Sequence, residues 1–316
     1  MLEPSGQPRV VSLLPSATEI VVALGRESQL VGRSHECDFP PSVVDRPACT
    51  RSSIDSSRPS AAIDADVRDH LAAALTLYEL DVSALAATQP DVILTQSQCE
   101  VCAIDQRQVE AELADQLDKP ARIVSLSPTT LSEVRESFAT VAAAIGADGS
   151  ALQMAFDERL ARAGRGAPDR VPRVLAVEWT DPPMSAGNWV PELLAAAGAD
   201  SVLAEIGSHS PYLTANAIAT ADPDVLLFAP CGFDLPRGRR EASDVLSREP
   251  WRSLRAVAEG RVYIADGNAY FNRPGPRLAD SAVIVAESLA YATGRREGFE
   301  FAGVGWSPFE AEHPQR

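Results

Sequence analysis

The sequence predicts an α/β protein with two Rossmann-like lobes joined by a single long backbone helix. Three observations support this fold class. Apolar, β-rich runs alternate with helical segments, a helix followed by a Pro-Asp-Val strand occurs in both halves, and one helical segment lies between the halves. Strands that alternate with helices favour parallel sheets. We therefore expect an N-terminal lobe over 1–146, a connecting helix within 147–168 and a C-terminal lobe over 169–316.

Local sequence signals place the elements of each half. Ser16 has Glu19 three residues later, which is the capping-box spacing, and Gly25 can stop the helix that follows. In the first half we expect strands at 9–14, 30–34, 90–96 and 121–126, and helices at 17–25, 80–89, 103–117 and 130–146. In the second half we expect strands at 173–179, 223–230 and 261–266, and helices at 189–198, 213–221 and 276–294.

The connecting segment reads as one helix from Ala147 to Ala163, ended by Gly164 and Pro168. At about 1.5 Å per residue such a helix spans roughly 25 Å, the breadth of a small lobe. A single connecting helix predicts a stiff link between the two lobes.

The composition excludes several classes of protein. The 316-residue chain has a net charge of −16, and an acidic surface repels phosphate backbones, so we expect no nucleic-acid partner. No apolar run approaches the roughly 20 residues of a membrane helix, so we expect no membrane partner. The N-terminal stretch contains Glu3 and no basic start, unlike a signal peptide. We therefore expect a cytoplasmic protein with reduced thiols.

Four of the five cysteines lie just past predicted strands, and they are Cys37, Cys99, Cys102 and Cys231. The carboxyl ends of parallel strands face the ligand crevice in such folds. Four thiolates suit zinc or an iron–sulfur cluster, and His35 is an alternative ligand. Two other interpretations stay open. The thiols could contact a metal-centred cofactor, or they could be unconnected buried side chains.

Other candidate ligand-binding residues follow the predicted strands. Pro15, Ser16 and Thr18 lie where backbone N–H groups could bind a polar or anionic group, although ordinary helix capping also explains them. Arg273 and Arg277 could bind carboxylate or amide oxygens, or pair with the abundant acidic residues. Aromatic side chains in two loops fit either a large planar ligand or lobe packing, and they are Trp179, Trp189, Tyr270 and Phe271.

Seven stretches carry a family resemblance over residues 9–292. In order they are SLLPSATEIVVALG, LVGRSHECDFPP, QPDVILTQ, PPMSAGNWVPELLAAAGADSV, ADPDVLLF, PWRSLRAVAEGRVYIAD and RPGPRL. Together they resemble the class III substrate-binding proteins of ABC importers, which bind vitamin B12, haem and iron–siderophores. The vitamin B12-binding members are the most similar. The resemblance implies two α/β lobes on one backbone helix, with a small-molecule ligand in the cleft between them. It also implies that the loop of Cys49 faces that cleft.

The chain departs from this family at positions that concern transport and the ligand. The vitamin B12-binding members dock on their permease through one surface glutamate on each lobe. The resemblance places Ser83 and Asn216 at those positions, so we expect no docking on an ABC permease. Glu36 and Arg51 stand where corrinoid binders carry aromatic residues, and both are candidate ligand contacts.

These observations lead to two hypotheses. The favoured one is a cytoplasmic binding protein whose cleft holds a corrinoid (cobalamin-like) or related metal chelate, for handling rather than for import. The alternative is a metalloprotein, including a metal-dependent enzyme, with a zinc or iron–sulfur site built from the cleft cysteines. The sequence contains no Ser-His-Asp spacing, Walker loop or dinucleotide fingerprint, and it leaves open whether the chain is an enzyme.

Overall fold

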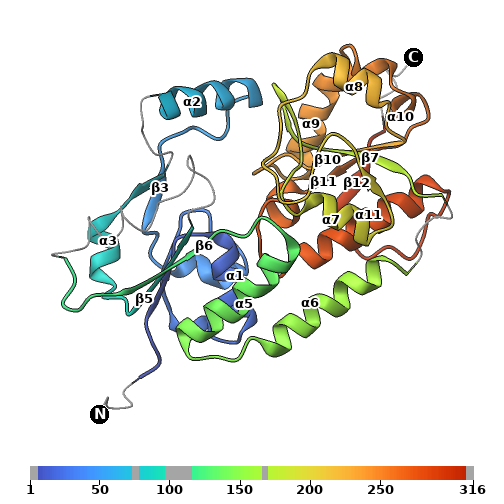
Figure 1. The fold of residues 1–316 in the computed structure, drawn as a ribbon. Helices are drawn as coiled ribbons and strands as arrows, with labels where there is room; N and C mark the ends of the chain where they lie inside the picture. The colour runs from blue at the N-terminus through green and yellow to red at the C-terminus, as the bar shows by residue number, and fades with distance from the viewer. Residues whose placement is uncertain (1–5, 73–77, 97–115, 166–169, 311–316) are drawn as a thin grey trace. The chain divides into compact units, whose positions relative to one another are not determined.

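The computed structural model describes residues 6–72, 78–96, 116–165 and 170–310 (Figure 1). The chain forms two units, and within these described ranges neither main sheet takes strands from both of them. The first unit comprises Met1–Arg58, Ala65–Pro128 and Ser132–Ala155, and the second comprises Pro59–Asp64, Thr129–Leu131 and Phe156–Arg316. The expected α/β fold class is confirmed, because each unit has its own largely parallel sheet.

The first unit is built on a four-stranded sheet in the order β2-β1-β5-β6. Every adjacent pair runs parallel, and Val10 of β1 lies opposite Leu30 on one side and Val92 on the other. The strands β1 and β5 are almost entirely buried, as their apolar residues predict. The strands of this unit are β1 (Val10–Ser12), β2 (Leu30–Arg33), β5 (Val92–Gln96) and β6 (Arg122–Leu126), with a separate antiparallel pair, β3 (Thr50–Ser52) and β4 (Tyr78–Leu80).

The first helix starts differently from the expectation. Pro15 occupies its first helical position and Leu14 is the N-cap, without a side-chain hydrogen bond. Capping by Ser16 is therefore wrong, because proline already has the backbone angle that a first turn needs. The expected helix at 103–117 lies almost wholly outside the described residues. Helical segments of this half are α1 (Pro15–Ala23), η1 (Glu27–Gln29), η2 (Pro41–Asp45), α2 (Ser60–Ala72), α3 (Val82–Ala87) and α5 (Leu131–Ile145).

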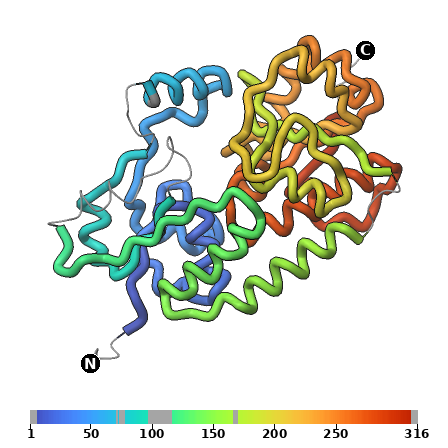
Figure 2. Tube along the Cα trace, in the orientation of Figure 1, coloured from blue at the N-terminus to red at the C-terminus, as the bar shows by residue number. Residues whose placement is uncertain are grey.

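The helix α6 (Ser150–Ala163) carries the chain from the first unit into the second. In the trace of Figure 2 it follows α5 after a short turn, both in green. The turn begins at Gly146, whose φ of +71° is a left-handed conformation that suits glycine. The carboxylate of Asp148 then accepts the backbone N–H of Ser150 at 2.9 Å. The helix consequently begins slightly later than the sequence predicts.

The second unit contains a six-stranded sheet in the order β12-β11-β10-β7-β8, with β9 also paired to β7. The strands β9, β7, β10 and β11 run parallel, whereas β8 and β12 are antiparallel additions at the edges. Its strands are β7 (Arg173–Thr180), β8 (Pro183–Ser185), β9 (Asp200–Ser201), β10 (Val225–Phe228), β11 (Val262–Ala265) and β12 (Trp306–Pro308). Its helical segments are α7 (Val190–Ala196), α8 (Ala215–Ala221), α9 (Leu235–Leu246), η3 (Trp251–Ser253), α10 (Arg255–Ala258), η4 (Gly267–Phe271) and α11 (Leu278–Ala292).

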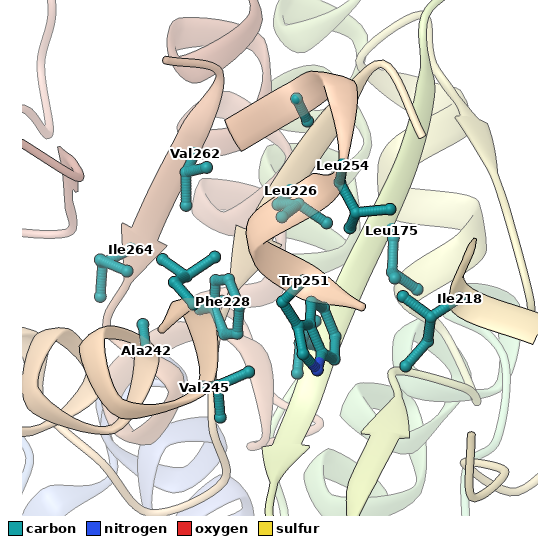
Figure 3. Close-up of a cluster of buried hydrophobic side chains, with 13 residues drawn as sticks. Leu175, Ile218, Leu226, Phe228, Ala242, Val245, Trp251, Leu254, Val262 and Ile264 are labelled. Atoms are coloured by element: carbon teal, nitrogen blue, oxygen red, sulfur yellow. The ribbon is translucent and has the colours of Figure 1, made fainter. Parts of the chain in front are cut away.

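A hydrophobic core fills one side of this second sheet (Figure 3). Leu226 and Phe228 project from the central strand β10, and Leu175 projects from its neighbour β7. The rings of Phe228 and Trp251 lie 5.7 Å apart between centroids. Burial of such side chains stabilises the folded chain by about 1.5–3 kcal/mol each. The core therefore holds the strand ends of this unit in fixed positions.

No helix among the described residues is long and apolar enough to span a membrane.

Candidate functional site

The sheet topology of each unit points to a ligand site at the carboxyl ends of particular strands. In the first unit the chain goes from β1 to β2 on one side and then to β5 on the other side of β1. In the second unit β9 and β10 lie on opposite sides of β7. Ligands of open parallel sheets bind where the strand order reverses in this way. The loops after β1 and β5, and those after β7 and β10, are therefore the candidate site segments.

A buried thiol lies beside the first of these loops. Cys37 is 1% exposed, and the hydroxyl of Thr18 donates a hydrogen bond to its sulfur at 3.0 Å. The same sulfur lies 4.0 Å from the carbonyl oxygen of Ser12, at the end of β1. Pro15 and Ser16 form the first turn of α1 next to this pair. The fold thus brings together two residues predicted from the sequence, Thr18 and Cys37, and both are buried.

A polar network surrounds His35, just past the end of β2. The hydroxyl oxygen of Thr50 accepts the backbone N–H of His35 at 3.0 Å and lies 2.7 Å from the ring Nδ1. That hydroxyl donates its proton to Ser34 Oγ at 3.0 Å. The ring of Tyr78 meets the imidazole edge-on, with centroids 4.9 Å apart. The Tyr78 hydroxyl donates to Glu36 at 2.8 Å.

Burial keeps the imidazole of His35 in its neutral form. The pKa of His35 is lowered mainly because burial penalises the charged ring, while Glu36 raises this pKa and Arg33 lowers it further. A neutral imidazole is the form that binds metals.

Arg51, by contrast, lies at the surface. It pairs with Asp81 at 3.0 Å and lies 3.9 Å from Glu79, and its side chain is largely exposed. Exposed pairs of this kind contribute little to stability, because solvent and salt screen the attraction between the charges. These contacts show how Arg51 is held, and its role toward a ligand stays a prediction.

The side chain of Cys49 has a different position from the one that the resemblance implied. Cys49 is fully buried in the hydrophobic core of the first unit, among Val11, Leu85 and Ile93. A Cβ atom added to Gly32 would lie 2.8 Å from its sulfur, so the thiol fills the space that this glycine leaves. Burial raises the pKa of Cys49 to about 11. The expectation that Cys49 faces a ligand cleft is therefore wrong.

In the second unit, aromatic and cationic side chains stack beside the ends of β7 and β10. The rings of Trp179 and Phe233 lie 5.2 Å apart between centroids. The guanidinium of Arg237 lies over the Phe233 ring, 3.6 Å from its centroid. Cys231 is exposed, and its backbone N–H donates to the Glu178 carbonyl at 3.0 Å. We call Trp179, Phe233 and Arg237 the aromatic–arginine stack.

Three other predicted residues of the second unit lie in its interior. Trp189 and Phe271 are 6% and 1% exposed, and the Trp189 indole N–H donates to the Phe271 carbonyl at 2.9 Å. Arg273 is also buried, and it donates to Asn268 at 3.0 Å. This burial favours packing as the role of the three side chains. Tyr270 is less buried, and its ring meets that of Phe301 edge-on.

The four-thiolate site stays a prediction. Cys99 and Cys102 lie outside the described residues, and Cys37 and Cys231 belong to different units. Cys99 and Cys231 do occupy matching places in the sequence, since each comes three residues after the last residue of its strand, β5 or β10. Within the described ranges, no group of three or more His, Cys, Asp or Glu side chains could hold a metal ion.

Sequence reasoning overlooked several contributors to these clusters. Ser34 and Phe233 each lie within two residues of a predicted ligand, so their positions in the sequence were sufficient to identify them. Arg237 lies on α9, one helical turn beyond the same loop. Thr50 is adjacent to the predicted ligand contact Arg51, but only folding brings its hydroxyl beside His35.

Comparisons with known proteins agree with this fold. A periplasmic heme-binding protein from Roseiflexus sp. RS-1, in its apo form, is 22% identical with a TM-score of 0.66, over 91% of this chain and 99% of that chain. A periplasmic heme-binding protein from Pseudomonas aeruginosa is 19% identical with a TM-score of 0.70, over 98% and 100%. The periplasmic vitamin B12-binding protein of Vibrio cholerae is 17% identical with a TM-score of 0.61, over 92% and 99%.

A search of curated proteins found no match. The structural similarities establish the fold, and they include the heme and vitamin B12 binders that the sequence resemblance indicated. A model of one family, described as periplasmic binding protein, matches residues 10–269. This chain therefore belongs to the periplasmic binding protein family.

Proposed function

We propose that this chain is a binding protein for a metal-centred tetrapyrrole, either a corrinoid or a haem, at the carboxyl ends of its parallel strands. The aromatic–arginine stack is the observation that carries the proposal. Trp179 and Arg237 are each partly exposed, and both pack against the buried Phe233 ring, whose centroid lies 5.2 Å from that of Trp179 and 3.6 Å from the Arg237 guanidinium. A planar macrocycle can stack on aromatic rings, while its carboxylate or amide groups accept hydrogen bonds from an arginine.

The family supports the same class of ligand. Solved structures with this fold include proteins described as binding heme and vitamin B12. Both ligands are large flat metal chelates. Because the similarity to them is below 25% in sequence identity, the choice between a corrin and a haem is left to experiment.

Equilibrium titration with aquocobalamin and with hemin tests the proposal. The purified chain should bind at least one of them saturably, with one molecule per chain. Replacement of the stacked guanidinium, Arg237→Ala, should weaken that binding about 10–150-fold, because a charge-assisted contact worth about 1.5–3 kcal/mol is removed. Binding of neither compound by the native chain would refute the proposed ligand class.

Arg239→Ala is the matched control for this titration. Arg239 lies on the same helix α9, and its guanidinium lies 5.9 Å from the centroid of the Phe309 ring. It also donates to Ser307 and to the Pro308 carbonyl, at the edge strand β12. Arg239→Ala removes the same type of side chain as Arg237→Ala, but at a place away from the loops after β7 and β10. Tetrapyrrole affinity should therefore stay unchanged, and an equal loss in both variants would argue against the aromatic–arginine stack as the site.

We propose further that the chain handles its ligand in the cytoplasm and does not serve an importer. This part of the proposal rests on the sequence alone. Ser83 and Asn216, which stand at the expected docking positions, are both exposed on the first turn of short helices, α3 and α8. Cell fractionation and a transport assay test it. Recovery of the chain outside the cytoplasmic membrane, or stimulation of uptake by it, would contradict this part.

A further inference from the structure

The second unit contains a cavity of about 240 Å³ near the end of β7. Thr180 at the end of β7, Ile218 on α8 and Val245 on α9 are among the residues that line it. Its described lining residues include no member of the aromatic–arginine stack. Arg237 lies in the first turn of α9, about 12 Å along the helix axis from Val245 in the last turn. The cavity is therefore a second space, separate from the proposed tetrapyrrole site.

One hydrogen-bond donor in the wall of this cavity lacks an acceptor. Of the four tryptophans, Trp179, Trp189 and Trp306 donate their indole N–H to oxygens of the chain, at 3.1, 2.9 and 2.7 Å. Trp251 is 4% exposed and lines the cavity, and its indole N–H makes no hydrogen bond within the part of the chain that the structure describes. Figure 3 shows the indole nitrogen at the end of the ring that points away from Leu226. The N–H is thus directed out of the core and into the cavity.

The cavity has the space and the apolar surface for a small ring compound. Ile218 and Val245 are 1% and 5% exposed, and Leu213 packs against the same core. A cavity of about 150 Å³ with apolar walls can hold benzene. The larger volume of this cavity, about 240 Å³, therefore accommodates a benzene ring with a short substituent.

The charged side chains in the cavity wall already have partners of opposite charge. Arg248 lies 3.3 Å from Asp181. Glu249 contacts Arg252 and accepts the hydroxyl of Ser253 at 2.8 Å. A charged ligand would lose part of its hydration and would have to compete with these pairs, which disfavours its binding. An uncharged ligand has no such penalty.

We propose that this cavity binds an uncharged, mainly apolar molecule of the size of a substituted benzene, with a carbonyl oxygen that accepts the indole N–H of Trp251. Ligand pockets commonly combine apolar walls with a few polar groups that fix the orientation of the ligand. A donor in an apolar wall is disfavoured until an acceptor reaches it, so the ligand oxygen is the feature that the site selects. The inference goes beyond the proposed function and does not depend on tetrapyrrole binding.

Three probe compounds with the same number of non-hydrogen atoms test the inference. Acetophenone is a benzene ring with one carbonyl oxygen, and it should bind the purified chain saturably. α-Methylstyrene has a CH₂ group in place of that oxygen and should bind about 5–150-fold more weakly, because it leaves the N–H of Trp251 without an acceptor. Benzoate carries a charge and should also bind more weakly than acetophenone.

The indole N–H resonances in ¹H–¹⁵N NMR spectra locate the bound probe. Acetophenone should shift one tryptophan indole resonance most strongly, and that resonance should be the one absent from Trp251→Phe. Trp251→Phe keeps an aromatic ring but removes the donor. It should therefore bind acetophenone and α-methylstyrene with similar affinity, whereas a purely structural role of Trp251 would weaken the binding of both compounds equally.

Two variants of α8 provide a test that leaves Trp251 in place. Ala215 lines the cavity and is exposed, so Ala215→Leu should fold, fill part of the cavity and abolish both acetophenone binding and the indole shift. Ala219→Leu is the matched control, because Ala219 is exposed on the same helix and is not one of the cavity residues. Acetophenone binding should be unchanged in this control. If Trp251→Phe does not fold, this pair of variants decides the result.

Several results would overturn the inference. They are no saturable binding of acetophenone, equal affinity for acetophenone and α-methylstyrene in the native chain, and tighter binding of benzoate. A shift of an indole resonance that persists in Trp251→Phe, or equal binding by Ala215→Leu and Ala219→Leu, would overturn it as well. Each of these results would leave the tetrapyrrole proposal untouched, since the titrations with aquocobalamin and hemin test that proposal separately.

Discussion

Cys49 shows how a single side chain can look like a site residue and serve the core instead. The sequence places it in a loop, and the resemblance suggests that this loop faces a ligand. The structure buries its thiol beside Gly32, whose missing side chain leaves the necessary space. The sequence does not show that Gly32 and Cys49 lie side by side, so the space beside this glycine is evident only in the folded chain.

This burial predicts a loss of stability at alkaline pH. The pKa of Cys49 rises from 9.0 to about 11 in the folded chain. Above pH 9 the unfolded chain releases this proton while the folded chain keeps it, so stability falls as the pH rises from 9 to 11. A difference of about two pKa units corresponds to about 2–3 kcal/mol. Urea unfolding at pH 8 and pH 11 should show this extra loss in the native chain and not in Cys49→Ala.

Cys231→Ala is the control for that experiment. Cys231 is exposed, so its removal should leave the alkaline loss in place. If the free energy of unfolding falls equally between pH 8 and pH 11 in the native chain and in Cys49→Ala, the thiol of Cys49 has the same pKa in the folded and unfolded chain. That result would contradict its burial.

At the scale of single elements, helix α9 depends on its cap. Asp234 precedes the helix, and its carboxylate accepts the backbone N–H of Arg237 at 2.9 Å. Asp234→Ala should lower the free energy of unfolding by about 1 kcal/mol, because one helix-end N–H loses its partner. Asp234→Asn should retain most of the stability, since asparagine caps equally well. Chemical denaturation measures both, and equal losses in the two variants would point to the charge rather than to the cap.

The central strand β10 contributes more to the free energy of unfolding than the cap of α9 does. Leu226 is fully buried in the core of the second unit (Figure 3). Leu226→Ala should destabilise this unit by about 2–5 kcal/mol, because it removes buried methyl groups and leaves a cavity. Leu226→Ile conserves the volume and should lower stability by less than about 1.5 kcal/mol. Denaturant unfolding followed by tryptophan fluorescence tests the order of the two effects, and a loss below 1 kcal/mol in the alanine variant would contradict this account of the core.

For the whole molecule, the sequence predicted the regular parts of the fold well. The strands β1, β5, β7, β10 and β11 are mainly apolar and rich in β-branched residues, so composition and length identified them. The antiparallel edge strands β8 and β12 were missed because each is three residues long and carries little periodicity. The predicted start of α1 was wrong because proline and serine both signal a helix start. In the structure the helix begins at Pro15.

Long-range contacts explain what the sequence could not predict. Residues 59–64 group with the second unit, although they come early in the chain. The Ser60 hydroxyl contacts Glu241 at 2.7 Å and Thr180 at 2.9 Å, and no local pattern connects residues so far apart. The candidate site also depends on contacts between residues that are far apart in the sequence. Its residues on strand-following loops could be predicted, whereas the Thr50 contact with His35 depends on the folded structure.

A single competition experiment tests the central claim that the chain binds a metal-centred tetrapyrrole. The purified chain is incubated without oxygen with equimolar aquocobalamin, hemin and zinc acetate, then desalted and analysed for metals and for absorption. The account predicts one cobalt or one haem iron per chain, retained together with tetrapyrrole absorption. It also predicts a raised melting temperature when the retained compound is added back at 100 times its Kd, where binding stabilises the folded state by about 2.7 kcal/mol. Retention of zinc alone, or of no metal and no chromophore, would contradict it.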